Sequence, residues 1–311
     1  MHRARDPARG GELAGRSGPG GERGGVNEPT RPLLRWHGGK WLLAPWIIDH
    51  FPSHRVYVEP YGGAASVLMR KQRSYAEVYN DLDDGVVNLM ALLRNGHGEN
   101  LANKLRMTPF ARAEFEMAYL PTDDIFESAR RLIVRSFMGF GSAGHNPNVR
   151  TGFRAASNRS GTTPAHDWAN YPDALLRIAE RMSGVVVERR PAMEIMAQHD
   201  GPETLHYVDP PYLPETRSTK SRKSGERYHA YQHEMNVEDH RAMLAGLRAL
   251  TGMVVLSGYP SALYDDALTG WRRVERRALA DGARERTEVL WLNPAVIERT
   301  SAGPLFGSAA A

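Results

Sequence analysis

An acidic residue, two prolines and a tyrosine directly follow an apolar run in the second half of the chain. Asp209-Pro210-Pro211-Tyr212 comes after Thr204 to Val208, which is typical of a buried strand. The prolines stiffen the backbone at the edge where open α/β sheets bind ligands. Asp209 and the Pro210 carbonyl are neighbouring acceptors that suit an exocyclic amine, and Tyr212 offers a ring for stacking on a flat base. A rigid Asp-Pro turn is the alternative, but the preceding strand favours a functional role.

A glycine-containing turn follows an earlier apolar run. Glu59-Pro60-Tyr61-Gly62-Gly63 lies between a predicted strand, 55–58, and a predicted helix, 64–72. Glycines at this point let a ligand approach the backbone, and the helix start supplies N–H donors. Asp81 lies 19 residues after Gly62, where nucleotide-binding sheets place a carboxylate for ribose hydroxyls. With no G-x-G-x-x-G pattern, a compact adenosine ligand is favoured over a dinucleotide, and a tight turn with a capping Asp is the structural alternative.

A third motif, Trp36-His37-Gly38-Gly39-Lys40, lies close to the start of the predicted ordered chain. Trp36 could pack on an adenosine ring and Lys40 could meet a carboxylate. In isolation the motif is equally compatible with a simple turn.

Strands and helices that alternate along the chain must position these motifs. Further strands are predicted at 75–79, 185–187, 204–208, 253–256 and 288–292, and further helices at 41–51, 83–94, 171–182 and 236–250. Alternation of this kind predicts an α/β fold with a mostly parallel sheet covered on both faces. The stretch 97–165 interrupts it with helices up to about residue 135 and a long loop over 138–164, which we interpret as an insertion.

Composition and charge narrow the class of protein further. The chain has 311 residues, 41% apolar and 24% charged, with no cysteine, so disulfides and thiolate-metal sites are excluded. No apolar run is long enough to cross a membrane, and we expect a cytoplasmic protein with no membrane partner. The net charge is only +4, but Ser128 to His166 holds six arginines and no acid. These arginines and a second basic run over 217–227 suit a polyanion, although a solvated surface would explain them equally well.

Taken in order, the motifs resemble the Dam-type N6-adenine DNA methyltransferases. The resemblance covers residues 33–293 and includes Phe137 to Phe140 and Thr151-Gly152-Phe153, which are similar to that family's target-recognition segment. It implies a Rossmann-like S-adenosylmethionine-dependent methyltransferase sheet with an inserted helical and loop DNA-recognition subdomain. Together with the composition and the order of the elements, it predicts a catalytic domain at 31–96 and 166–300, the recognition subdomain at 97–165, a disordered tail at 1–30 and a flexible tail at 301–311.

The resemblance also implies roles for individual residues. S-adenosylmethionine is expected to bind a cofactor set consisting of Trp36, Lys40, Glu59, Pro60, Tyr61, Gly62, Gly63, Asp81 and Asp209. Asp209, Pro210 and Tyr212 are the expected catalytic residues, and no metal is expected. Arg150, Arg154, Arg159, Arg217, Lys220, Arg222 and Lys223 are the expected contacts to double-stranded DNA. We expect a monomer or a weak dimer.

The expected reaction methylates the 6-amino group of an adenine flipped out of the duplex. Asp209 and the Pro210 carbonyl would orient the amine, and the proton would leave after methyl transfer. Three alternatives are a DNA cytosine-N4 methyltransferase, an RNA amino-methyltransferase and a DNA-binding relative without catalysis. Family cytosine enzymes usually carry Ser at the position of Asp209, which disfavours the first. The run Phe153-Arg154-Ala155-Ala156-Ser157 departs from the family's Phe-Asn-x-Pro-x-Gly pattern, so the recognition sequence is not inherited.

Overall fold

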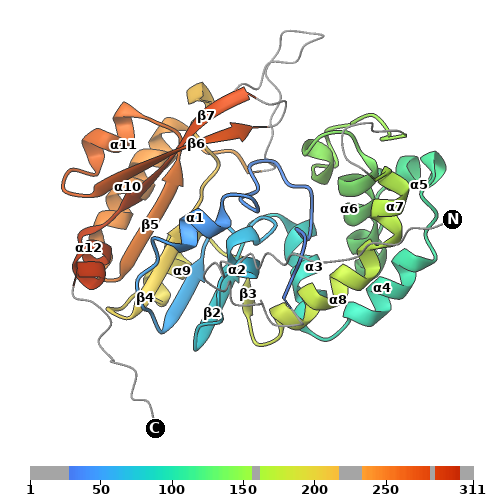
Figure 1. Cartoon of the computed structure of the whole chain (residues 1–311), viewed down its shortest axis with the longest axis horizontal. Coiled ribbons are helices and arrows are strands. Elements are labelled where there is room, and N and C mark those ends of the chain that lie inside the picture. The colour runs from blue at the N-terminus through green and yellow to red at the C-terminus, as the bar shows by residue number, and fades with distance from the viewer. Residues whose placement is uncertain (1–27, 156–161, 217–232, 281–283, 302–311) are drawn as a thin grey trace, which may run out of the picture.

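The computed structural model of the chain describes residues 28–155, 162–216, 233–280 and 284–301, and Figure 1 shows their arrangement. Within these ranges the strands are β1 Val56–Glu59, β2 Ala76–Asn80, β3 Val186–Glu188, β4 Thr204–Val208, β5 Met253–Gly258, β6 Arg272–Ala280 and β7 Arg284–Leu292. The α-helices are α1 Ala44–Ile48, α2 Ser66–Arg70, α3 Asp84–Arg94, α4 Gly98–Arg106, α5 Arg112–Met117, α6 Ile125–Met138, α7 Pro164–Ala169, α8 Tyr171–Met182, α9 Ala192–Gln198, α10 Val237–Ala249, α11 Ala262–Ala267 and α12 Pro294–Ser301. Two short 3₁₀ helices are η1 Ala143–His145 and η2 Pro214–Thr216.

The strands form one sheet in the order β3-β2-β1-β4-β5-β7-β6. The first five are mutually parallel, and β7 pairs antiparallel with both β5 and β6. From β1 the chain proceeds outward through β2 to β3, whereas β4 returns to the other side of β1 and is followed by β5. The strand order therefore reverses between β1 and β4, and open α/β sheets bind their ligands at the carboxyl ends of such a switch point.

Successive apolar side chains along the strands pack alternately on the two faces of the sheet. On β5, Met253 and Val255 belong to the core that α1, α2, α3, α6 and α8 cover, while Val254 and Leu256 belong to the core under α9, α10 and α11. This alternation confirms the predicted sheet with both faces covered.

Helices α4 to α8 lie in the long connection between α3 and β3, and Figure 1 shows them gathered beside the sheet. Helices α4, α6 and α8 of this group all pack against α3, and α8 also contacts α2. Leu101 of α4 and Ile133 of α6 belong to the same apolar core as Tyr57 of β1. The division of the chain into a catalytic domain and a recognition subdomain at 97 and 165 stays a prediction.

The predicted elements are present, with differences that have local causes. The helix expected over 41–51 is limited to Ala44–Ile48, because Pro45 lacks an N–H and occupies the first turn. The helix expected from residue 64 begins at Ser66, because Gly63 and Ala65 adopt positive φ. Strand β6 was not predicted, because its sequence, Arg272 to Ala280, is rich in arginine and lacks a clear apolar pattern. Such charge is usual in an edge strand, where it discourages pairing with other chains. None of the described helices is long and apolar enough to span a membrane.

Candidate active site

The turn after β1 is held in place by two side chains of β2. Tyr79 donates from its hydroxyl to the carbonyl of Gly63 at 2.8 Å, and Asn80 donates from Nδ2 to the carbonyl of Pro60 at 2.9 Å. Gly63 has φ +47°, and a Cβ there would lie 2.6 Å from Nε1 of Trp36. A side chain at this position would therefore be strained and would displace Trp36. With no side chain at Gly63, the backbone of this turn stays accessible at the carboxyl end of β1.

Asp81 follows β2 and is anchored by backbone donors. Its Oδ2 accepts from the N–H of Gly63 at 2.8 Å, and its Oδ1 accepts from the N–H of Asp83 at 2.9 Å. Burial raises the pKa of Asp81, while these backbone hydrogen bonds act in the opposite direction. The carboxylate is thereby fixed beside the β1 turn, at the position predicted for a ribose-binding residue.

Asp209 follows β4 and pairs with the lysine of the third motif. Lys40 Nζ lies 2.9 Å from Asp209 Oδ2 and donates to the carbonyl of Gly38 at 2.7 Å. Burial raises the pKa of Asp209 and Lys40 lowers it. The other oxygen, Oδ1, is buried and lacks a hydrogen bond of good geometry. The hydroxyls of Tyr212 and Ser257 also lower the pKa of Asp209, although less than Lys40 does. Within the described ranges no backbone N–H donates to the carbonyl of Pro210 either.

Tyr212 is buried, with 5% of its surface exposed. Lys40 Nζ lies 4.7 Å from its ring centroid, and the ring packs edge-to-face on Tyr259. Its hydroxyl lies 3.1 Å from Ser257 Oγ and donates to Glu288 Oε2 at 3.3 Å. Glu288 lies in the predicted strand 288–292, and Ser257 lies one residue beyond the predicted strand 253–256. Their link to Tyr212 depends on the pairing of β5 with β7. That Tyr212 stacks on a base stays a prediction.

Glu59 is buried at the end of β1. Its Oε2 accepts from the Tyr57 hydroxyl at 2.7 Å and from the N–H of Leu68 at 3.0 Å. Burial outweighs these hydrogen bonds and raises the pKa of Glu59 to about 8, so the side chain is mostly protonated at neutral pH. A neutral Glu59 can donate a hydrogen bond to a ligand but contributes little charge.

A cavity of about 260 Å³ lies at the carboxyl ends of β1, β2 and β4 and brings the predicted cofactor set together. All nine members of that set line it, from Trp36 to Asp209. Pro211 lines the cavity as well, whereas Pro210 and Tyr212 lie outside its lining. His145 also lines it, and no sequence motif had singled this residue out. The described residues contain no group of three or more His, Asp or Glu arranged to hold a metal ion, and the expected absence of a metal stays a prediction.

Two of the predicted DNA-contacting residues are described. Arg150 is exposed, with its guanidinium 5.2 Å from the Tyr119 ring centroid, and Arg154 lies beside the bridge between Gly139 and Phe153. No described carboxylate lies within ion-pair distance of either arginine. Arg159, Arg217, Lys220, Arg222 and Lys223 lie outside the described residues.

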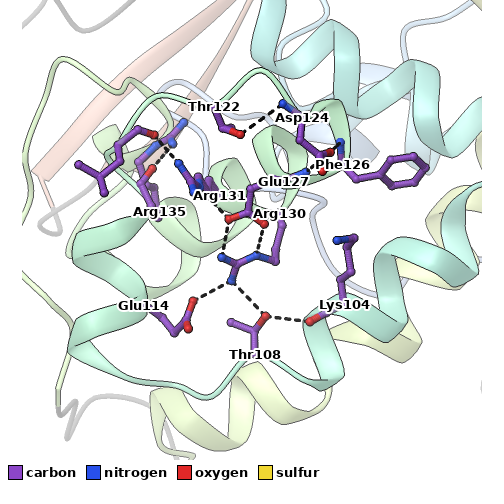
Figure 2. Close-up of polar contacts among 12 residues, drawn as sticks. Lys104, Thr108, Glu114, Thr122, Asp124, Phe126, Glu127, Arg130, Arg131 and Arg135 are labelled. Carbon is purple, nitrogen blue, oxygen red and sulfur yellow. Dashed lines mark hydrogen bonds and ion pairs between the residues drawn. The ribbon is translucent and has the colours of Figure 1, made fainter.

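The arginines of α6 are not the polyanion surface that the acid-free stretch 128–166 suggested, and that interpretation was wrong for them. Arg130 pairs with Glu127 at 2.7 Å and with Glu114 at 2.8 Å, and Arg131 pairs with Glu127 at 2.7 Å. Figure 2 shows this network, in which Thr108 also accepts from Arg130. Arg135 is buried and donates to the carbonyl of Ala118. The acids that neutralise the first two arginines precede residue 128 in sequence but are close in space.

The mostly parallel seven-stranded sheet, with its cavity at the carboxyl ends of β1, β2 and β4, is consistent with a Rossmann-like methyltransferase fold. Residues 36–257 match the D12 class N6 adenine-specific DNA methyltransferase family, and the chain belongs to that family. It is 25% identical over 242 residues to a DNA adenine methylase of Salmonella typhi, covering 75% of this chain and 82% of the relative. It is also 26% identical over 194 residues to the DNA adenine methylase of Escherichia coli (strain K12), covering 60% of this chain and 66% of the relative. The resemblance stated from the motifs is confirmed.

Proposed function

We propose that this protein transfers the methyl group of S-adenosylmethionine to the 6-amino group of adenine in double-stranded DNA at the cavity between β1 and β4. Family membership supports the methylation of adenine in DNA. The observation that carries the assignment to this cavity is the state of Asp209. One of its oxygens pairs with Lys40, and the other is a buried acceptor without a hydrogen bond of good geometry from a described residue.

The cavity residues fit the methyl donor. Asp81 at the end of β2 suits the ribose hydroxyls, and the backbone of the β1 turn leaves room for the methionine half. Trp36 offers an aromatic face. When bound, S-adenosylmethionine supplies an electrophilic methyl group on a sulfonium.

Asp209 and Pro210 then act on the target amine as acceptors. Hydrogen bonds from its two N–H groups to Asp209 Oδ1 and the Pro210 carbonyl favour a pyramidal nitrogen whose lone pair points at the methyl. The bound donor would supply its methyl group to this nitrogen and leave as S-adenosylhomocysteine, and the methylated amine would then release its extra proton to water. Holding the reacting atoms in line reduces the barrier by about 7–11 kcal/mol at best. Lys40 favours the ionised form of Asp209 against the burial that raises its pKa, and it holds Oδ2 in place.

Recognition of the duplex is assigned to the inserted segment 97–165. An adenine in a duplex must be flipped out to reach the cavity, which costs a few kcal/mol. Arg150 and Arg154 project from this segment without a described acidic partner and are suited to phosphate contacts.

Product analysis tests this proposal. The purified protein is incubated with S-adenosylmethionine and either duplex DNA or RNA, and the nucleosides are separated by mass. N6-methyladenine from duplex DNA supports the proposal. N4-methylcytosine, or methylation of RNA alone, contradicts it. Absence of both methylation and calorimetric binding of S-adenosylmethionine would identify a DNA-binding relative without catalysis.

A further inference from the structure

His145 is a buried polar side chain in the cavity that the proposed reaction has not used. It lies in η1, within the inserted segment and more than 60 residues from any of the four motifs that line the site. Its side chain is 2% exposed and stacks on Trp36, with ring centroids 3.9 Å apart and an interplanar angle of 29°. Gly144 permits this placement, because a Cβ there would collide with the carbonyl of Arg135 in α6. The insertion therefore contributes a residue to the cavity.

The protonation state of the imidazole follows from its contacts. Nδ1 lies 2.9 Å from the carbonyl oxygen of Ser142, which can only accept, so Nδ1 carries the proton. Burial lowers the pKa of His145 to about 4, and the ring is neutral at physiological pH. Nε2 therefore presents a lone pair. It is buried and has no hydrogen-bond partner among the described residues, although it belongs to a residue that lines the cavity. A buried acceptor of this kind costs free energy unless a ligand donates to it.

The strand order indicates which part of the methyl donor meets this acceptor. Three groups are bonded to the sulfonium sulfur of the methyl donor: the methyl group, the ribose with its adenine, and the methionine half. The methyl must reach Asp209 after β4, and the ribose is assigned to Asp81 after β2, with β1 between them. The methionine half is left with the turn after β1, where Gly63 lies against Trp36. His145 stacks on that same tryptophan.

We infer that Nε2 of His145 accepts a hydrogen bond from the α-ammonium group of the methionine half of S-adenosylmethionine. This inference rests on the proposed function of the cavity. A neutral imidazole with Nδ1 committed to Ser142 can accept but cannot donate, so it suits the ammonium and not the carboxylate. A segment assigned to DNA recognition thus supplies a contact to the methyl donor.

Two substitutions distinguish the hydrogen-bond role of His145 Nε2 from the stacking role of the imidazole ring. His145→Phe retains the stacking on Trp36 but removes the acceptor, and His145→Gln returns an acceptor of similar reach. Calorimetry on the full-length protein compares three ligands. S-adenosylmethionine carries both the ammonium and the carboxylate, its decarboxylated form carries only the ammonium, and 5′-methylthioadenosine carries neither. Thermal unfolding of each variant without ligand checks that it is folded.

The inference predicts that His145→Phe binds S-adenosylmethionine and its decarboxylated form roughly 10- to 100-fold more weakly, the range for hydrogen bonds to charged groups. Affinity for 5′-methylthioadenosine should be unchanged, and His145→Gln should recover part of the loss. Equal affinity of His145→Phe and wild type for all three ligands would overturn the inference. So would a loss common to all three, which would place His145 at the nucleoside, or a loss for S-adenosylmethionine alone, which would place it at the carboxylate. If the wild-type protein bound none of the ligands, the proposed function itself would fail.

Discussion

Lys40 and Asp209 are 169 residues apart in sequence, yet the lysine ammonium lies 2.9 Å from Asp209 Oδ2 at the carboxyl end of β4. The lysine is 5% exposed, so solvent screens this ion pair only weakly. Burial raises the pKa of Asp209, and Lys40 is the main influence that lowers it. Lys40 thereby favours the ionised form of the residue proposed to orient the target amine.

Replacing Lys40 should therefore shift the pH dependence of methyl transfer. Without the ammonium, the pKa of Asp209 rises further, so in Lys40→Met the acid limb of the pH–rate profile moves to higher pH. Activity at pH 7 falls more than activity at pH 9. Lys71→Met is the matched control, because Lys71 is also buried and pairs with Glu77 at 2.7 Å without lining the cavity. A profile for Lys40→Met with the wild-type midpoint would contradict this role.

Glu59 makes the stability of the protein depend on pH. Its pKa is raised in the folded state to about 8, so folding favours the protonated form. The stability contributed by this group is present below pH 4.5 and is lost as the pH rises toward and through 8. Glu59→Gln should thus lose less unfolding free energy than wild type between pH 5 and pH 9. The expected difference is on the order of a few kcal/mol, at about 1.4 kcal/mol per pKa unit. Urea unfolding at both pH values measures it, and parallel losses in the two proteins would refute the assignment.

Arg150 and Arg154 should contribute electrostatically to DNA binding. Each phosphate contact that is removed should reduce the slope of log affinity against log salt by about 0.9. Arg150→Ala and Arg154→Ala should each weaken binding of a duplex oligonucleotide, with a shallower salt dependence. Arg248→Ala is the control, because Arg248 is an exposed residue in the last turn of α10 and donates to the carbonyl of Ala267. If both loop variants had the wild-type DNA affinity and the wild-type slope against salt, this loop would not be part of the DNA interface.

Arg130, unlike the two loop arginines, should contribute to the stability of the protein and not to DNA binding. It is buried and pairs with Glu114 and Glu127, so Arg130→Leu leaves Glu114 without this partner and Glu127 with Arg131 alone. We expect a loss of about 3 kcal/mol in unfolding free energy, measured by urea titration. The salt dependence of DNA binding should be that of wild type under conditions where the variant is folded. If Arg130→Leu were as stable as wild type and its DNA binding had a shallower salt dependence, Arg130 would belong to the DNA interface.

The motifs around Glu59 and Asp209, together with Asp81, could be placed because each lies at the end of a strand with a clear apolar pattern. The residues after β1, β2 and β4 meet at one sheet edge whenever those strands are parallel neighbours, so Glu59, Asp81 and Asp209 were accessible to sequence reasoning. His145 was not, because its position depends on how η1 packs on α6 and on Trp36. The partners of Arg130 were missed for a similar reason. Glu127 is three residues away on the same helix, just outside the acid-free window, and Glu114 lies on a different helix.

The central claim is that Asp209 orients the adenine amine for methylation, and Asp209→Ala tests it most directly. Methyl transfer to duplex DNA is measured as N6-methyladenine after nucleoside separation. The unfolding transition and the DNA affinity of the same preparation serve as controls. We predict no detectable N6-methyladenine from a folded variant that retains much of its DNA affinity. Methylation of adenine at a rate near that of the wild-type protein would contradict the account.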